Sequence, residues 1–112
     1  MPAIDLHSAA DGTPIPMDRT ACLVLMWNTW CRASPRAIAF LARLQAEISG
    51  ELKAYTCTES ASPSEARSAL DSMQSWHIPN TTHGFVAPGQ FAQWGLAYVP
   101  EFMLVWKGCG IV

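Results

Sequence analysis

The segment Ala21–Trp27, with the sequence ACLVLMW, constrains the fold of this 112-residue chain more than any other feature. It has no polar residue in seven positions, so neither face of a strand built from it would suit water. Such a run is typical of a strand buried on both faces, as in the centre of a parallel sheet. Parallel neighbours need a crossover, which is usually a helix. The run therefore predicts a βαβ unit with a right-handed crossover.

A helix is expected soon after this strand. Ser34 suits the N-cap position, and Pro35 suits the first helical position, where the missing N–H of proline costs little. Gly50 is placed for a left-handed C-terminal cap. The apolar positions between them recur every three or four residues, as one buried helix face requires. They are Ala37, Ile38, Leu41, Leu44 and Ile48.

The remaining pattern predicts a second strand, a second helix and a terminal hairpin. Ser62-Pro63-Ser64-Glu65 is a capping box, and Pro79 ends that helix near His77. The other expected elements follow in chain order. They are an edge strand starting at Ile4–Leu6, a turn at Asp11-Gly12, strand Glu51–Cys57, a short strand at Phe85–Val86, a helical turn or two in Gln90–Leu96, strand Glu101–Trp106, a turn at Lys107-Gly108 and strand Cys109–Val112.

Composition excludes two function classes. The net charge of −2 lacks the basic excess that nucleic-acid binding by bulk electrostatics requires. No apolar run approaches the ~20 residues of a membrane span. The first ten residues lack the basic start and apolar core of a signal peptide, which favours the cytoplasm. A signal removed earlier would instead place the protein in the periplasm or another extracytoplasmic space.

The cysteines do not form a metal-binding pattern. Cys22, Cys31, Cys57 and Cys109 include no pair at the two-residue spacing of a zinc knuckle or dithiol motif. The three histidines are scattered along the chain. We therefore expect neither a metal nor any other cofactor, and the missing signal peptide favours reduced thiols.

Three stretches in the right order resemble the thioredoxin-fold superfamily, in its TlpA/ResA-like or AhpC/TSA (redoxin) branch. Asp11–Pro16 (DGTPIP) resembles the "DGK-x-V" turn, and Leu23–Cys31 (LVLMWNTWC) resembles the active-site strand "VVLNFWATWC". Tyr98–Val112 (YVPEFMLVWKGCGIV) resembles the cis-proline hairpin "GVPTTFLIDKDGRIV". The resemblance implies an α/β thioredoxin-like fold. Its central mixed sheet joins a parallel βαβ half to an antiparallel hairpin and is flanked by helices.

The same resemblance assigns the site. Cys31 holds the position of the attacking cysteine, just before a helix whose N-terminus stabilises a thiolate. Trp30 and Arg32 flank it as substrate-binding residues. Pro100 matches the cis-proline that faces the cysteine, and Val99 before it offers backbone hydrogen bonds to a substrate chain.

The chain departs from that family at three positions. The motif is Cys31-Arg32-Ala33-Ser34, so Ser34 replaces the second cysteine and the usual internal release of a mixed disulfide is not expected. Ser34 is then either an N-cap or a catalytic residue. Leu25 is nearest the place of a buried polar residue that helps move protons, and Ala37 replaces a glutamate.

Three routes can restore turnover. A glutathione-like thiol can resolve the mixed disulfide at Cys31. Cys57 can also resolve it, because in this fold the strand Glu51–Cys57 ends at the same sheet edge as Cys31. Cys22 and Cys109 fall at the opposite edge. Cys31 can also react with peroxide through a sulfenic acid, although Asn28 replaces the threonine of the peroxiredoxin pattern.

We therefore predict a single thioredoxin-like domain, residues 1–112, with a lone nucleophilic Cys31 that acts on protein or small-molecule disulfides. The alternatives are a redox-inactive peptide-binding module, a peroxiredoxin-like thiol peroxidase with antioxidant activity, and a copy without activity. The family's last helix is absent from the pattern. The sheet face beside the Ser34–Ser49 helix should therefore expose apolar surface. Either a partner subunit, such as a second copy in a homodimer, or residues missing from this chain should cover that surface, or it should promote aggregation.

Overall fold

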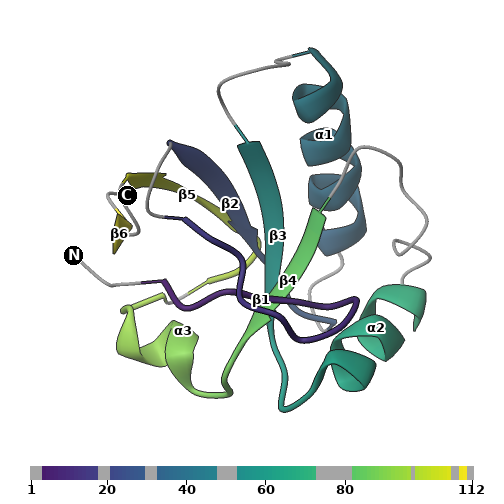
Figure 1. Ribbon diagram of the computed structural model, residues 1–112. Helices are drawn as coiled ribbons and strands as arrows, with labels where there is room; N and C mark the ends of the chain where they lie inside the picture. Colours follow the sequence, from purple (N-terminus) through teal and green to yellow (C-terminus); the bar gives the residue numbers. More distant parts are fainter. Residues whose placement is uncertain are drawn as a thin grey trace.

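The apolar run forms strand β2, Cys22–Met26, in the interior of the sheet (Figure 1). The computed structural model describes residues 4–17, 21–29, 33–47, 53–72, 82–96, 98–106 and 109–110. Predictions made for Ile48, Gly50, His77, Pro79 and the turn at 107–108 lie outside these residues. The elements after β2 are α1 (Ser34–Glu47), β3 (Lys53–Glu59), α2 (Pro63–Ser72), β4 (Thr82–Val86), α3 (Gln90–Gln93), β5 (Glu101–Trp106) and β6 (Cys109–Gly110), and β1 (His7–Ser8) precedes it.

The described strands form one mixed sheet with the order β1-β4-β3-β2-β5-β6. Strand β3 runs parallel to both β2 and β4. Strand β5 runs antiparallel to β2 and β6, and β1 runs antiparallel to β4. The predicted combination of a parallel βαβ half and an antiparallel hairpin is confirmed.

Three strand predictions were wrong in extent. Strand β3 continues two residues past Cys57, because Thr58 and Glu59 also pair with β4. Strand β4 covers five residues rather than Phe85–Val86, because pairing with β3 overrides the weak strand propensity of its central His83-Gly84. Strand β1 starts at His7 rather than at Ile4. The buried side chain of Leu6 packs against Gly84 of β4. A side chain at position 84 would collide with Leu6, so this position requires a glycine.

Successive residues of a strand point to opposite faces of the sheet, and their side chains form two hydrophobic cores, one on each face. On one face, Val24 and Met26 of β2 share a cluster with Phe91 of α3. On the other face, Leu25 packs in a cluster with Ile38 of α1 and with residues of α2. Figure 1 shows α1 and α2 beside the sheet, with α3 apart from them.

Helix α2 begins at the predicted capping box. The Ser62 Oγ accepts the backbone N–H of Glu65 at 3.2 Å. The Glu65 carboxylate accepts the backbone N–H of Ala61 at 3.3 Å. In the usual capping box it would accept the N–H of the N-cap residue, which is Ser62 here. The predicted N-cap is therefore confirmed.

Exposed apolar side chains lie on the α1 side of the sheet, as predicted. Phe102 and Leu104 of β5 oppose Leu25 and Leu23 in register, so they share that face. They remain 36% and 43% exposed, and Phe40 of α1 is 47% exposed. The Phe40 and Phe102 rings meet edge to face, with centroids 6.1 Å apart.

Candidate functional site

The site is assembled at the sheet edge where β2 and β3 end. Met26 opposes Cys57 of β3 and Glu101 of β5, so residues 27–29, 58–60 and 99–100 all lie at this edge. The carboxyl ends of parallel strands are where ligands bind in open α/β sheets. Trp30, Cys31 and Arg32 follow directly in the chain and lie outside the described residues.

The Val99–Pro100 peptide bond is cis, as the resemblance implied. Both residues are half-buried and directly precede β5. The antiparallel pairing of β5 with β2 therefore places this bond beside the end of β2. Cys31 follows the end of β2 by five residues in the sequence.

Ser34 is not the N-cap of α1, and this prediction was wrong. The N–H of Ala37 is accepted by the Ala33 carbonyl at 3.0 Å, so Ala33 occupies the N-cap and Pro35 is the second helical residue. One position into the helix, the Ser34 side chain is completely buried. Its Oγ has no hydrogen-bond partner in the described part of the chain. An unpaired buried hydroxyl costs about 1–3 kcal/mol.

Trp27, the first residue after β2, has a similar unsatisfied group. Its side chain is completely buried in the α1-side core, and its Nε1 has no partner among the described residues. The backbone N–H of Trp27 is bound to the Cys57 carbonyl at 3.0 Å, which continues the β2–β3 ladder by one residue. Two buried unpaired donors therefore bracket residues 28–33, and such groups in native structures call for an explanation.

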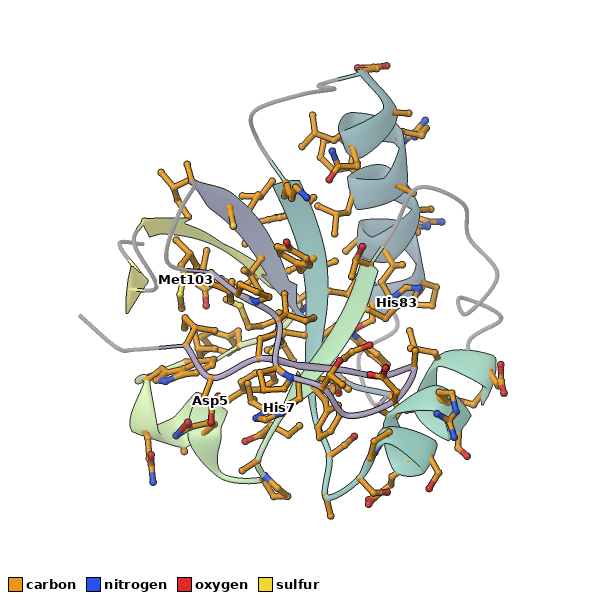
Figure 2. The ribbon with its side chains drawn as sticks, in the orientation of Figure 1. Asp5, His7, His83 and Met103 are labelled. Carbon is orange, nitrogen blue, oxygen red and sulfur yellow. The ribbon has the colours of Figure 1, made fainter. Side chains whose placement is uncertain are left out.

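A buried polar pair lies next to the position where the family carries a proton-transfer residue. Leu25 is buried and opposes Thr56 of β3, which in turn opposes His83 of β4 (labelled in Figure 2). The Thr56 Oγ1 and the His83 Nδ1 are 2.7 Å apart. Sequence reasoning missed this pair, because single polar residues in apolar strands show no pairing until the register is known.

Cys57 and Cys22 are both completely buried, and neither forms a disulfide within the described residues. Burial, with a smaller effect from the Glu59 carboxylate, raises the pKa of Cys57 far above its usual range. A thiol that stays protonated is a poor attacking group, so these properties disfavour Cys57 as the resolving cysteine. Cys22 of β2 opposes Val105 of β5, and Cys109 of β6 opposes Trp106 of β5. Strand β5 therefore lies between the two strands that carry these cysteines. Both cysteines are at the end of the sheet opposite to Cys57.

A cavity of about 330 Å³, here called the edge cavity, opens beside the segment that leads to Cys31. Two carboxylates line it, those of Glu59 and of Glu65 in α2. The Glu59 Oε2 accepts the Phe91 N–H at 3.1 Å. No sequence pattern predicted this cavity, because the described part of its wall comes from four separate segments. The wall consists of Asn28, Thr29, Thr58, Glu59, Ser60, Glu65, Ala69 and Phe91.

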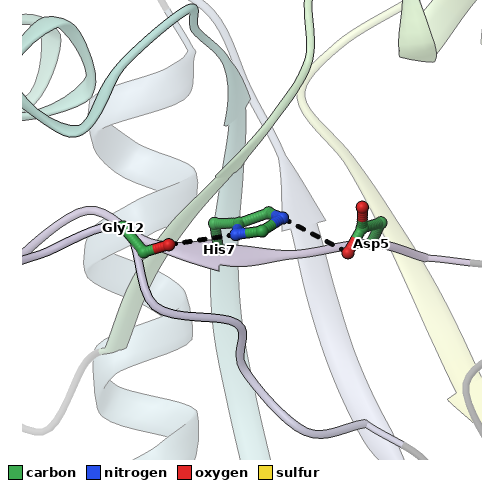
Figure 3. Close-up of polar contacts among 3 residues, drawn as sticks. All are labelled: Asp5, His7 and Gly12. Atoms are coloured by element: carbon green, nitrogen blue, oxygen red, sulfur yellow. Dashed lines mark hydrogen bonds and ion pairs between the residues drawn. The ribbon is translucent and has the colours of Figure 1, made fainter.

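The side chain of His7 makes two polar contacts within the N-terminal segment. His7 lies between Gly12 and Asp5, as Figure 3 shows: its Nδ1 is 3.0 Å from the Gly12 carbonyl and its Nε2 is 3.3 Å from the Asp5 carboxylate. A carbonyl only accepts, so Nδ1 donates in this bond, and the contact of Nε2 with Asp5 is an ion pair only when Nε2 is protonated as well. A second cavity of about 250 Å³ includes Asp5, His7 and Ser60 in its wall. Both ring nitrogens are engaged, so His7 is not arranged to activate Ser60.

Within the described residues, no helix is long and apolar enough to cross a bilayer.

Comparison with known proteins identifies the fold. No family model and no curated protein matches the sequence. An exposed lipoprotein thioredoxin of Streptococcus pneumoniae matches with a TM-score of 0.75 at 12% identity, over 99% of this chain and 87% of that one. The thioredoxin domain of a Bacteroides vulgatus thiol-disulfide oxidoreductase matches with 0.72 at 14%, over 99% and 81%. A secreted Mycobacterium tuberculosis disulfide oxidoreductase matches with 0.67 at 15%, over 97% and 81%. The sheet order, the cis bond before β5 and these matches together show that the chain has a thioredoxin-like α/β fold.

Proposed function

We propose that this protein is a thiol–disulfide oxidoreductase in which Cys31 is the only redox-active cysteine. The observation that carries the proposal is the buried hydroxyl of Ser34, three residues after Cys31 in the sequence, which has no hydrogen-bond partner among the described residues. A hydroxyl can donate a hydrogen bond to a thiolate but cannot form a disulfide. A group that costs stability and serves no cap is typical of a functional position. The structural matches include a thioredoxin and a disulfide oxidoreductase, and these support the same class of reaction.

Helix α1 supplies the electrostatic environment that a thiolate needs. Its first turn contains no acidic residue and does contain the exposed Arg36. The free N–H groups at a helix N-terminus carry a partial positive charge and stabilise an anion nearby. Cys31 precedes this helix, and Arg32 adds a second positive charge. We expect both to favour the ionised form of Cys31.

The reaction then has two stages that balance. The Cys31 thiolate attacks one sulfur of a disulfide R–S–S–R′, a Cys31–S–S–R bond forms, and R′–S⁻ leaves and takes up a proton. A glutathione-like thiolate attacks the Cys31 sulfur and releases R–S⁻, and a second one regenerates the Cys31 thiolate. The net change reduces one disulfide and oxidises two small thiols to their disulfide. We propose that Trp30 and the Val99–Pro100 segment hold the substrate chain during the first attack.

The test is incubation of the reduced protein with glutathione disulfide, followed by intact mass measurement and peptide mapping. We expect a single glutathione adduct on Cys31 and none in Cys31→Ser. Ser34→Cys should lose the adduct by forming an internal disulfide with Cys31.

Equal labelling of several cysteines, or no labelling of Cys31, would overturn the proposal. Binding of extended peptides without any adduct would favour the redox-inactive module.

A further inference from the structure

The edge cavity carries negative charge without a local counter-charge. Its wall includes the carboxylates of Glu59 and Glu65, and the described residues of the wall include no lysine, arginine or histidine. In the described part of the chain, neither carboxylate has a cationic partner. Arg67, on the same helix as Glu65, donates to the carbonyls of Ala9 and Ala10 at 3.1 and 2.6 Å and is therefore committed elsewhere.

The rest of the wall suits a long side chain with a cationic tip. Phe91 and Ala69 provide apolar surface, against which the methylene stem of a lysine or arginine can pack. Thr29 and Thr58 provide hydroxyl oxygens that can accept the N–H groups of such a tip. A volume of about 330 Å³ falls within the range of small-molecule sites, so it accommodates one side chain with room to spare.

The cavity is also close to the proposed nucleophile along the chain. Thr29, in its wall, precedes Cys31 by two residues. Two residues span at most about 7 Å between Cα atoms, whatever their conformation. A substrate whose disulfide sulfur reaches Cys31 therefore brings its neighbouring side chains within reach of the cavity.

From these three observations we propose that the edge cavity binds a lysine or arginine side chain adjacent to the disulfide-bonded cysteine of a polypeptide substrate. This inference rests on the proposed function of Cys31, and it names the substrate class: protein disulfides with basic flanking sequence. Glu59 and Glu65 act as substrate-binding residues that set specificity, and take no part in the sulfur chemistry.

The probes are short peptides whose single cysteine is joined to thionitrobenzoate by a disulfide, with lysine, arginine, norleucine or glutamate as the neighbouring residue. Attack by Cys31 releases coloured thionitrobenzoate, or the peptide thiol, and the rate is followed by absorbance and mass. In the native protein we expect the basic peptides to react several-fold faster than the norleucine peptide, and the glutamate peptide to react most slowly.

The variants are Glu59→Gln and Glu65→Gln. A glutamine keeps an acceptor oxygen for the N–H of Phe91 or of Ala61, so each variant removes charge while retaining its hydrogen bond. Each should lower the rate for basic peptides by about two- to fivefold and leave the norleucine peptide unchanged. The matched control is Glu47→Gln, an exposed residue at the other end of α1, roughly 20 Å along the helix.

The outcomes separate this inference from the proposed function. Equal rates for all four peptides, at a Cys31 that reacts well, would overturn the cavity assignment and leave the function standing. Glutamine variants that slow every peptide alike would also overturn it, since they would show a structural effect. A Cys31 that reacts with no peptide would overturn both.

Discussion

Replacing Ser34 with alanine should leave the protein as stable as before or make it more stable. The side chain is completely buried, and its hydroxyl makes no hydrogen bond within the described residues. Removing an unpaired buried hydroxyl recovers a desolvation cost of about 1–3 kcal/mol, less the packing of one oxygen atom. The expected gain in the free energy of unfolding is therefore between zero and about 2 kcal/mol.

The matched control is Ser62→Ala at the start of α2. There the serine Oγ accepts the Glu65 N–H at 3.2 Å, and its loss should cost about 1 kcal/mol. Urea unfolding measures both, as a shift of the midpoint at unchanged m-value. The two substitutions should thus move the midpoint in opposite directions.

A loss of about 1 kcal/mol or more in Ser34→Ala, similar to that in Ser62→Ala, would refute this reasoning, because it would show that Ser34 caps the helix after all. The same variant has a functional readout. If the Ser34 hydroxyl donates to the thiolate, Ser34→Ala should slow the reaction of Cys31 with glutathione disulfide near neutral pH while the protein becomes no less stable.

Three further predictions follow from buried and capping groups. Thr56→Val removes the hydrogen bond to the buried His83 and should cost about 1–3 kcal/mol in urea unfolding; a neutral result would mean that the pair adds nothing. Hydrogen bonds from Thr13 hold the pKa of Asp11 below its ordinary 3.8, so this carboxylate stabilises the fold above that pH and the benefit is lost as the pH falls through the lower folded value. The stability advantage of the native protein over Asp11→Asn should therefore shrink as the pH falls below 3.8, and an advantage that did not change with pH would contradict the assignment. Iodoacetamide should leave the buried Cys22 and Cys57 unmodified in the folded protein, and rapid alkylation of either would show that it is accessible.

Local sequence signals predicted the elements that carry strong periodicity. The apolar run of β2, the stripe of Ile38 and Leu41 in α1 and the strand Glu101–Trp106 appear where the sequence placed them. The Ser62 cap also appears as predicted, because a capping box is a short-range pattern that depends on neighbouring residues alone.

Features that depend on sheet register could not be predicted in this way. Strand β4 has few apolar residues, so its bounds become apparent only from its pairing with β3. The Thr56–His83 pair and the two carboxylates of the edge cavity come together only once separate segments are placed side by side. Ser34 was misassigned because a sequence pattern locates the start of a helix only to within one or two residues. The hydrogen bond from the Ala37 N–H to the Ala33 carbonyl shows that the N-cap is Ala33, one residue before Ser34.

The pH dependence of Cys31 alkylation tests the central claim most directly. The rate constant for modification of Cys31 by iodoacetamide, mapped by mass spectrometry, reports the fraction of thiolate at each pH. An activated lone nucleophile at the start of α1 predicts a half-maximal rate at or below about pH 7. A half-maximal rate at about pH 8.5, the ordinary value for a thiol, would contradict the claim that this chain uses Cys31 for disulfide chemistry.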